Sequence, residues 1–287
     1  MENILRQKEL IQAGNWDCLI VLDACRYDFF ERIYSDFLKG YLRKVITSGT
    51  STPHWLRNTF KGRYWDDVVY ISGNPFINSK SVNLVNFRGD KHFFKVVDAW
   101  DSCWDDDMKT TMPDKLASLT KRMRAKYPNK RIISHFMQPH YPYLGLGPVK
   151  GGISGIQHSA STEINEEGYS PKLKYFIRVL MEKVLGWEHA KKMEKALGFI
   201  KVAGDEEVFR VAERYNKTKL RKLYEDNLIR VLKEVRLIAS VLPGKIVVTS
   251  DHGELLGEKD FIWGHPGKYN HPILKQVPWF ELDDGGN

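Results

Sequence analysis

Short apolar runs alternate with longer amphipathic segments along the chain, and this alternation predicts an α/β fold. Strands are expected at residues 17–22, 43–47, 68–72, 131–136 and 245–250. Several of these runs are continuously apolar, which is typical of strands that are covered on both faces. The pattern therefore favours a mostly parallel central sheet with helices packed on it.

Four amphipathic segments predict helices at residues 28–38, 52–60, 113–127 and 216–242. The last is the best supported, because its apolar residues recur at helical spacing and a Pro-Gly pair follows it. Between residues 145 and 211 the strand signal disappears. We interpret 145–211 as a helical insertion or cap within a single domain that spans residues 1–287.

The insertion begins with a glycine-rich loop and continues into a basic stretch, since residues 172–201 hold eight basic and three acidic residues. Packing of this stretch against the domain is the first expectation. Peripheral contact with an anionic membrane surface or a glycan is the alternative.

The composition is that of a globular protein, with 42% hydrophobic and 28% charged residues in a chain of 287. No run reaches the roughly 18 apolar residues that a membrane-spanning helix needs. The N-terminal residues are polar and lack the apolar region of a secretory signal, so a cytoplasmic location is expected. The three cysteines form no C-x-x-C pair, and neither a disulfide framework nor a cysteine zinc site is expected.

The formal net charge is +8, which biases the surface toward anions. Phosphorylated or sulfated substrates, anionic lipids and nucleic acids all fit this bias. No helix-turn-helix, zinc-finger or RNA-recognition pattern is present, so specific nucleic-acid binding is not expected.

Polar side chains follow four of the predicted strands. They are Asp23, the stretch 48–52, the stretch 138–140, and Asp251 with His252. In an open parallel sheet, ligands bind beyond the carboxyl ends of the strands, so these residues are expected to share one site.

Two metal-capable side chains stand in succession at Asp251-His252, and Gly253 lets the backbone turn beside a ligand. Asp23 is either a helix N-cap or a further ligand. Carboxylates with an imidazole suit Zn²⁺ or Mn²⁺, whereas carboxylates alone would favour Ca²⁺ or Mg²⁺. The sequence therefore predicts a divalent cation site.

Six segments carry a resemblance to a known family: WDCLIVLDACRYD, TSGTSTPHWL, HFMQPHYPY, VVTSDHGELLGE and the later GHP and VPW. They are spread from residue 16 to residue 279. Together they resemble the alkaline phosphatase and sulfatase superfamily, especially the sulfatase-like branch that includes phosphoglycerol transferases. The resemblance implies a three-layer α/β/α sandwich with a mostly parallel sheet.

The resemblance also implies roles for individual residues. Asp23, Asp251 and His252 are similar to the metal ligands of the family, and the Ser51 oxygen would complete the site. Ser51 stands at the place of the nucleophile. Its neighbours Thr50 and Thr52 remain alternatives, because phosphate-transferring relatives often use Thr.

Two departures from the family pattern narrow these expectations. Trp55 stands where modified sulfatases carry an Arg, which favours an unmodified hydroxyl nucleophile and phosphate esters over sulfate esters. Gln138 stands where an acidic ligand of a second metal is expected, and a neutral amide is a poor substitute for it. One divalent cation is therefore expected rather than two.

The remaining candidates are a group of histidines and one arginine. His140 resembles a substrate-contacting histidine that donates a proton to the leaving group or to a phosphoryl oxygen. His265 is placed like a late active-site histidine, with His271 as the competing choice. Arg26 either binds the phosphoryl group or forms an ion pair, and His135 is expected to be a hydrogen-bonded core residue.

The leading hypothesis is a metal-dependent phosphoester hydrolase or phosphoryl transferase, of the phosphoglycerol type, with a covalent hydroxyl nucleophile. The alternative enzyme is a sulfatase that hydrolyses sulfate esters. The alternative that is not an enzyme is a catalytically inactive protein that binds an anionic ligand. The sequence leaves open the substrate, the choice between hydrolysis and transfer, and the oligomeric state.

Overall fold

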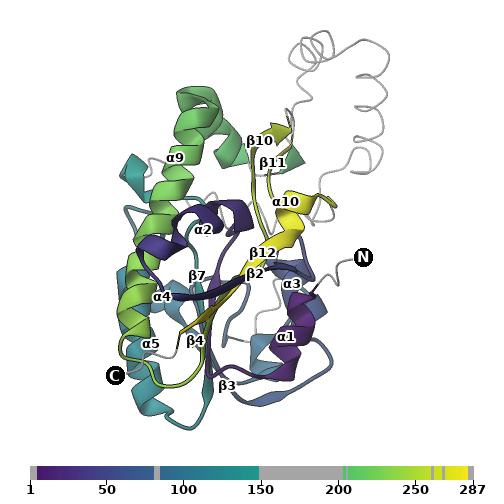
Figure 1. Ribbon diagram of the computed structural model, residues 1–287, viewed down its shortest axis with the longest axis vertical. Helices are drawn as coiled ribbons and strands as arrows, with labels where there is room; N and C mark the ends of the chain where they lie inside the picture. Colours follow the sequence, from purple (N-terminus) through teal and green to yellow (C-terminus); the bar gives the residue numbers. More distant parts are fainter. Residues whose placement is uncertain are drawn as a thin grey trace.

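A computed structural model describes residues 5–80, 85–148, 203–204, 206–259, 262–266 and 269–283. Its centre is a seven-stranded sheet (Figure 1). The strands lie in the order β2 (Gly40–Ile46), β12 (Gln276–Leu282), β9 (Ile246–Ser250), β1 (Cys18–Leu22), β7 (Arg131–Phe136), β3 (Trp65–Ser72) and β4 (Phe93–Asp98). Strand β12 runs antiparallel to both of its neighbours, and the other paired strands are parallel.

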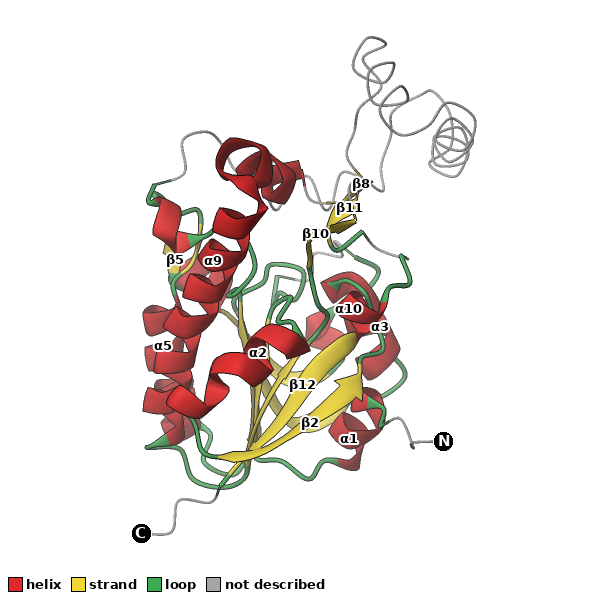
Figure 2. Cartoon of the chain, turned by 45° about the horizontal axis from the view of Figure 1, so that its top comes forward, coloured by secondary structure: helices red, strands yellow, loops and turns green. Residues whose placement is uncertain are grey.

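Helices cover both faces of this sheet. One face carries α1 (Gln7–Ala13) and α3 (Thr52–Phe60), and the other carries α2 (Tyr27–Ile33), α5 (Pro113–Lys126) and α9 (Glu206–Ala239), as Figure 2 shows. The described chain therefore has the three layers and the mostly parallel sheet that the sequence predicts.

Strand β1 shows why the central strands are apolar throughout. Its residues Cys18, Ile20 and Leu22 pack into the core beneath α2, α5 and α9, while Leu19 and Val21 pack into the core beneath α1 and α3. All five are fully buried. Because side chains on both faces of the strand are buried, polar and apolar residues do not alternate along it, in agreement with the continuously apolar run in the sequence.

The shorter elements lie around this frame. They are α4 (Ala99–Ser102), α10 (Pro272–Lys275), the pair β5 (Trp104–Asp105) and β6 (Thr110–Thr111), the small sheet of β8 (Ala203–Gly204), β10 (Leu255–Lys259) and β11 (Ile262–Gly264), and 3-10 turns at Tyr34–Asp36, Gly89–Lys91 and Leu144–Leu146.

All five predicted strands and all four predicted helices form. The helix expected at 28–38 ends at Ile33 and continues as a 3-10 turn. The helix expected from residue 216 is the second part of α9, because the backbone leaves the helical conformation at Asn216 (φ +72°), and a first helical part precedes it from Glu206. Strands β4 and β12 were missed. Pro278 lies inside β12, and a proline lowers the strand signal although this strand pairs on both sides.

Most of the predicted insertion at 145–211 lies outside the described residues, including the basic stretch 172–201. Its described parts are the 3-10 turn at Leu144–Leu146, β8 and the first turns of α9. Among the residues that the structure describes, no helix combines the length and the apolar character that crossing a membrane requires.

Phe60 offers a test of the core beneath α3, because its ring is fully buried against four other aromatic rings. We expect Phe60→Ala to lower the free energy of unfolding by about 3 to 5 kcal/mol, since it leaves a large cavity. Urea denaturation followed by circular dichroism measures this. Tyr64 is 55% exposed, and Tyr64→Ala, as the matched control, should cost less than about 0.5 kcal/mol.

Candidate active site

Three adjacent parallel strands bring the predicted residues together at one edge of the sheet. In the register of these strands, Leu22 of β1 lies opposite Ser250 of β9 and Phe136 of β7. The next residues, Asp23 and Asp251, therefore meet just beyond the strand ends. Both carboxylates are buried.

The side chains at this edge form a first cluster, made of Asp23, Thr52, His135, Asp251 and His252. The Thr52 hydroxyl donates to Oδ2 of Asp251 at 2.8 Å and lies 3.4 Å from Nε2 of His252. That same Nε2 is 3.6 Å from Oδ1 of Asp23 and 3.4 Å from Oδ2 of Asp251. Two carboxylates, an imidazole and a hydroxyl thus converge on one small volume.

The geometry separates the three neighbouring hydroxyls that the sequence left open. Thr52 is the first residue of α3 and directs its oxygen into the first cluster. Ser51 is the N-cap residue, has an extended backbone, and makes no side-chain hydrogen bond with the described residues. Thr50 is buried just before it. Of the three, Thr52 has the hydroxyl that contacts a carboxylate and the imidazole of the first cluster, and Ser51, which the sequence favours, is the residue before it.

Asn74 belongs to the site and was not predicted. Its amide donates to Oδ2 of Asp23 at 2.9 Å and its Nδ2 lies 3.5 Å from the Thr52 oxygen. It follows the carboxyl end of β3, so the rule that singled out the other strand ends also points to this residue.

His135 is buried and hydrogen-bonded, as expected of a core residue, but it also faces the site. Its Nδ1 pairs with the Tyr70 hydroxyl at 2.8 Å, while Nε2 lies 3.8 Å from Asp251 and 4.0 Å from Asp23. Burial lowers the pKa of His135 to about 4, so the ring is neutral at pH 7.

Burying two neighbouring carboxylates in the first cluster costs free energy unless a positive charge lies beside them. Burial and the neighbouring Asp251 carboxylate raise the pKa of Asp23 well above its usual value. Burial opposes ionisation of Asp251, but the two histidines together with the hydrogen bonds from Thr52 and the Ala24 N–H hold the pKa of Asp251 below its usual value. Two buried carboxylates side by side repel each other, and a divalent cation would remove that repulsion.

The donor atoms fit a cation. One oxygen each from Asp23 and Asp251 and a nitrogen of His135 lie within 4.8 Å of one another. Within the described part of the chain, Oδ1 of Asp23 and Nε2 of His135 are buried without a hydrogen-bond partner. Buried orphan acceptors of this kind are typical of ligands to a metal ion, and the mixture of carboxylate and imidazole suits Zn²⁺ or Mn²⁺.

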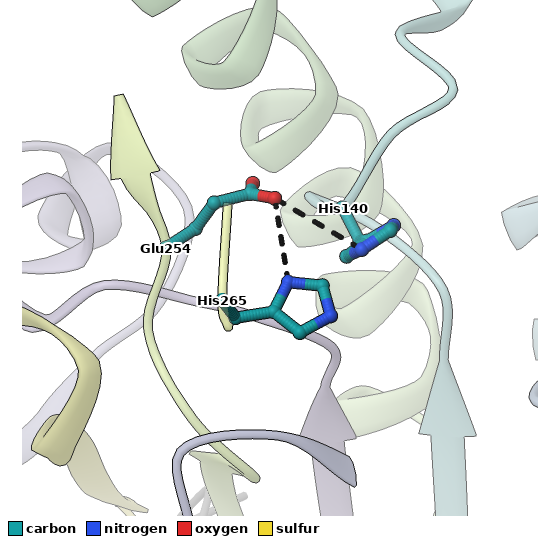
Figure 3. A group of neighbouring side chains, drawn as sticks. All are labelled: His140, Glu254 and His265. Carbon is teal, nitrogen blue, oxygen red and sulfur yellow. Dashed lines mark ion pairs between the residues drawn. The ribbon is translucent and has the colours of Figure 1, made fainter. Parts of the chain in front are cut away.

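A second cluster lies beside the first and consists of His140, Glu254 and His265 (Figure 3). Oε1 of Glu254 is 3.9 Å from Nε2 of His140 and 3.8 Å from Nδ1 of His265. Glu254 is fully buried. The ring centroids of His265 and His252 are only 4.4 Å apart, so the two clusters adjoin.

The second cluster contains an acidic residue, Glu254, of the kind that was expected at position 138 as a ligand of a second metal. The Gln138 amide instead donates to the backbone of Thr111 at 3.1 Å. Glu254 comes from the SDHGE segment, three residues after Asp251. An acidic group does accompany the two histidines here, and the expectation of a single cation stays a prediction.

The remaining candidates have structural partners. His271 is the N-cap of α10, where its Nδ1 accepts from the backbone N–H of Ile273. Arg26 is buried and pairs with Asp28 at 2.7 Å and Glu258 at 2.6 Å. The ion pair that the sequence left as an alternative for Arg26 is thus formed, and its guanidinium is committed to carboxylates.

No protein-family profile matches the chain, and no curated protein sequence matches it. Several solved structures, in contrast, are similar to this chain. A candidate sulfatase from Bacteroides thetaiotaomicron superposes with a TM-score of 0.55 at 10% identity, covering 93% of this chain and 64% of that one. The chain thus spans slightly less than two thirds of that structure.

Two transferase domains are similar at lower scores. The soluble domain of lipooligosaccharide phosphoethanolamine transferase A from Neisseria meningitidis has a TM-score of 0.49 at 14% identity, over 92% of this chain and 75% of that one. The C-terminal periplasmic domain of phosphoethanolamine transferase EptC from Campylobacter jejuni has a TM-score of 0.47 at 14% identity, over 93% of this chain and 78% of that one. At such identities a likeness concerns the fold alone, and the match to the candidate sulfatase confirms the α/β/α architecture expected from the sequence.

The repulsion between the two buried carboxylates gives a stability prediction. In chelator, we expect Asp23→Asn to raise the melting temperature, by about 2 to 4 °C for each kcal/mol of repulsion removed. Added Zn²⁺ or Mn²⁺ should reverse the order, because it stabilises the wild type by binding its folded state and the variant less. Differential scanning calorimetry with and without metal measures both effects.

Asp67→Asn is the matched control. Asp67 is a half-exposed carboxylate that pairs with Arg131, away from the cluster. Its substitution should not raise the melting temperature, and the metal response should equal that of the wild type. An Asp23→Asn variant that melts lower than the wild type in chelator would contradict the argument.

Proposed function

We propose that this chain, which has the fold of the alkaline phosphatase and sulfatase superfamily, is a metal-dependent phosphoester hydrolase or phosphoryl transferase with Thr52 as its nucleophile. One observation carries the proposal: the Thr52 hydroxyl donates to Asp251 and faces His252 inside a buried cluster whose Asp23 oxygen has no partner among the described residues. A hydroxyl in a purely structural cluster does not require such a set of ionisable neighbours.

Asp23, Asp251 and His252 would hold the cation, with the His135 nitrogen as a further donor. When bound, a divalent cation lowers the pKa of a neighbouring hydroxyl and screens the charge of a phosphoryl group. Asp251 accepts the Thr52 hydrogen bond and so fixes the direction of the oxygen. The Asn74 amide lies beside both Asp23 and Thr52, where it can donate to a phosphoryl oxygen.

The start of α3 adds to this anion site. Thr52 is the first residue of a nine-residue helix, and Pro53 after it has no N–H, so the helix dipole rather than a row of N–H groups is the contribution here. The positive end of this dipole at the helix N-terminus favours an anion. The nucleophile therefore sits where a phosphoryl group would be stabilised.

The second cluster adjoins the first and offers a further group of metal-capable side chains. Burial and the neighbouring His252 and His140 lower the pKa of His265 well below its usual value, so this ring is neutral and suited to bind a metal. We propose that His140, Glu254 and His265 hold a second divalent cation. Proton donation from His140 to the leaving oxygen is the alternative role.

Phosphate esters are favoured over sulfate esters by the surroundings of Trp55. Its ring is fully buried, packs edge-on against Phe60 and donates to Gln7 at 2.9 Å. The position at which modified sulfatases carry an Arg is thus a core position here. A sulfatase remains the second candidate, and an inactive protein that binds an anionic ligand remains the third.

The substrate of either enzyme would be an anionic ester, and the ligand of the inactive protein would also be an anion. Contact with a membrane or a glycan through residues 172–201 stays a prediction, since that stretch is not among the described residues. The cytoplasmic location expected from the polar N-terminus also stays a prediction.

Turnover of chromogenic esters tests the nucleophile. We expect Thr52→Ala to lower kcat by at least about 1,000-fold, because it removes the attacking oxygen. Ser51→Ala, the matched control one residue away, should lower kcat by less than about 10-fold. The opposite order would return the role to Ser51.

The same assay separates the classes of function. Metal-stripped protein is resupplied with Mn²⁺, Zn²⁺, Ca²⁺ or Mg²⁺ and given a phosphomonoester, a phosphodiester and a sulfate ester, with Asp251→Ala as the inactive control. Preference for a sulfate ester would favour the second candidate. Binding of metal without turnover of any ester would favour the third.

Counting cations tests the second cluster. We expect equilibrium dialysis followed by mass spectrometry to find two Zn²⁺ per wild-type chain, and one per chain in both Glu254→Gln and Asp251→Asn. A single cation in the wild type that survives Glu254→Gln would assign the second cluster to proton transfer instead.

A further inference from the structure

One face of α9 reaches the backbone of the site. Lys217 and Arg221 donate to the carbonyls of Gly257 and Leu256 in β10, and further along the helix Tyr224 and Asn227 bond to two other site loops. The four residues are spaced by four, three and three positions, so they lie on one side of the helix. Figure 1 shows α9 running alongside the sheet over most of its length.

Tyr224 holds the loop that follows Asp23. Its hydroxyl donates to the carbonyl of Ala24 at 2.7 Å and accepts from the N–H of Arg26 at 2.9 Å. Ala24 has a φ of +58°, a left-handed conformation that is unfavourable for a residue with a side chain. Its N–H donates to Oδ1 of Asp251. The loop thus adopts an unfavourable conformation that links both carboxylates, and Tyr224 bonds to it on both sides of Cys25.

Asn227 holds the loop that carries His140. Its Nδ2 donates to the carbonyls of His140 at 3.2 Å and Pro142 at 3.0 Å, and its Oδ1 accepts from the N–H of Leu144 at 2.9 Å. The side chain is fully buried. Since Nδ2 also lies 3.4 Å from the carbonyl of Pro139, one amide contacts four backbone groups of this loop.

We infer that Tyr224 and Asn227 are positioning residues, each for a different cluster: Tyr224 sets Asp23 in the first cluster, and Asn227 sets His140 in the second. The inference rests on the proposed function, in that it takes the two clusters to be cation sites. Packing α9 on the sheet does not need these polar groups, because Leu220, Leu223 and Leu228 on the same helix supply the apolar contact. Burying a phenol and an amide carries a desolvation cost, which their hydrogen bonds to these loops offset.

Hydrogen exchange on metal-free protein tests the loops directly. Tyr224→Phe removes one oxygen and keeps the ring, which packs edge-on against Phe29. We expect faster amide exchange in a peptide covering 24–30 and unchanged exchange in a peptide covering 137–147. Asn227→Leu should do the reverse, and Asn227→Ser replaces it if the leucine variant does not fold. Tyr215→Phe, in the first part of α9 before the break at Asn216, is the control and should change neither peptide.

The affinity of each cluster for a cation tests whether Tyr224 and Asn227 each act on one cluster only. In a Glu254→Gln background only the first cluster is left to bind, and in an Asp251→Asn background only the second. Titration calorimetry with Zn²⁺ should show that Tyr224→Phe weakens binding about 10- to 100-fold in the first background and less than about twofold in the second. Asn227→Leu should show the crossed result.

The outcomes distinguish the inference from the proposed function. Equal weakening of both clusters by either variant, or unchanged exchange in both peptides, would overturn the inference, since α9 would then be a general scaffold. Wild-type protein that binds Zn²⁺ but turns over no ester would overturn the proposed function alone, because the crossed affinities would still be measured. Wild-type protein that binds no Zn²⁺ would overturn both.

Discussion

The site is organised around two carboxylates that share one buried volume. Asp23 and Asp251 leave adjacent parallel strands at the same level, so the register of β1 and β9 forces them together. The burial of like charges costs free energy, and each nearby group reduces it. His252 and His135 lie beside the carboxylates, Thr52 and the backbone N–H of Ala24 donate to Asp251, and Asn74 donates to Asp23. Removing any one of these partners leaves charge uncompensated in a place that water does not reach.

That constraint explains why the surrounding frame is so heavily hydrogen-bonded. The buried Gln7 amide of α1 donates to the Thr249 hydroxyl and the Ser250 carbonyl at the end of β9, and its oxygen accepts from Trp55 of α3. A single side chain thus joins the strand that delivers Asp251 to the helix that delivers Thr52. On the opposite face of the sheet, Tyr224 of α9 does the same for the loop after Asp23. The site is held from both helical layers.

The sequence predicts the frame of this site better than its details. The ends of the strands can be predicted from the sequence, because buried strands are apolar and the residues just beyond them are polar. This change from apolar to polar residues pointed to Asp23, Asp251, His252 and the hydroxyl stretch before α3. The choice of Thr52 over Ser51 depends on where the helix begins, since one residue turns a side chain by about 100° around a helix axis. The strand-end rule also placed His140 at the site, but Glu254 lies three residues beyond Asp251 and was not expected there. Asn74 was within reach of the strand-end rule and was overlooked because a neutral amide carries no charge signal.

Charge balance links the second cluster to the nature of the substrate. Asp23, Asp251 and Glu254 together place three carboxylates around the reacting position, and all three are buried. One divalent cation would leave this set net negative, which repels a phosphoester. Arg26 does not correct the balance, because Asp28 and Glu258 already neutralise it. A second divalent cation at His140, Glu254 and His265 would make the set net positive. On this argument, an anionic substrate favours the second cation over the alternative of proton donation from His140.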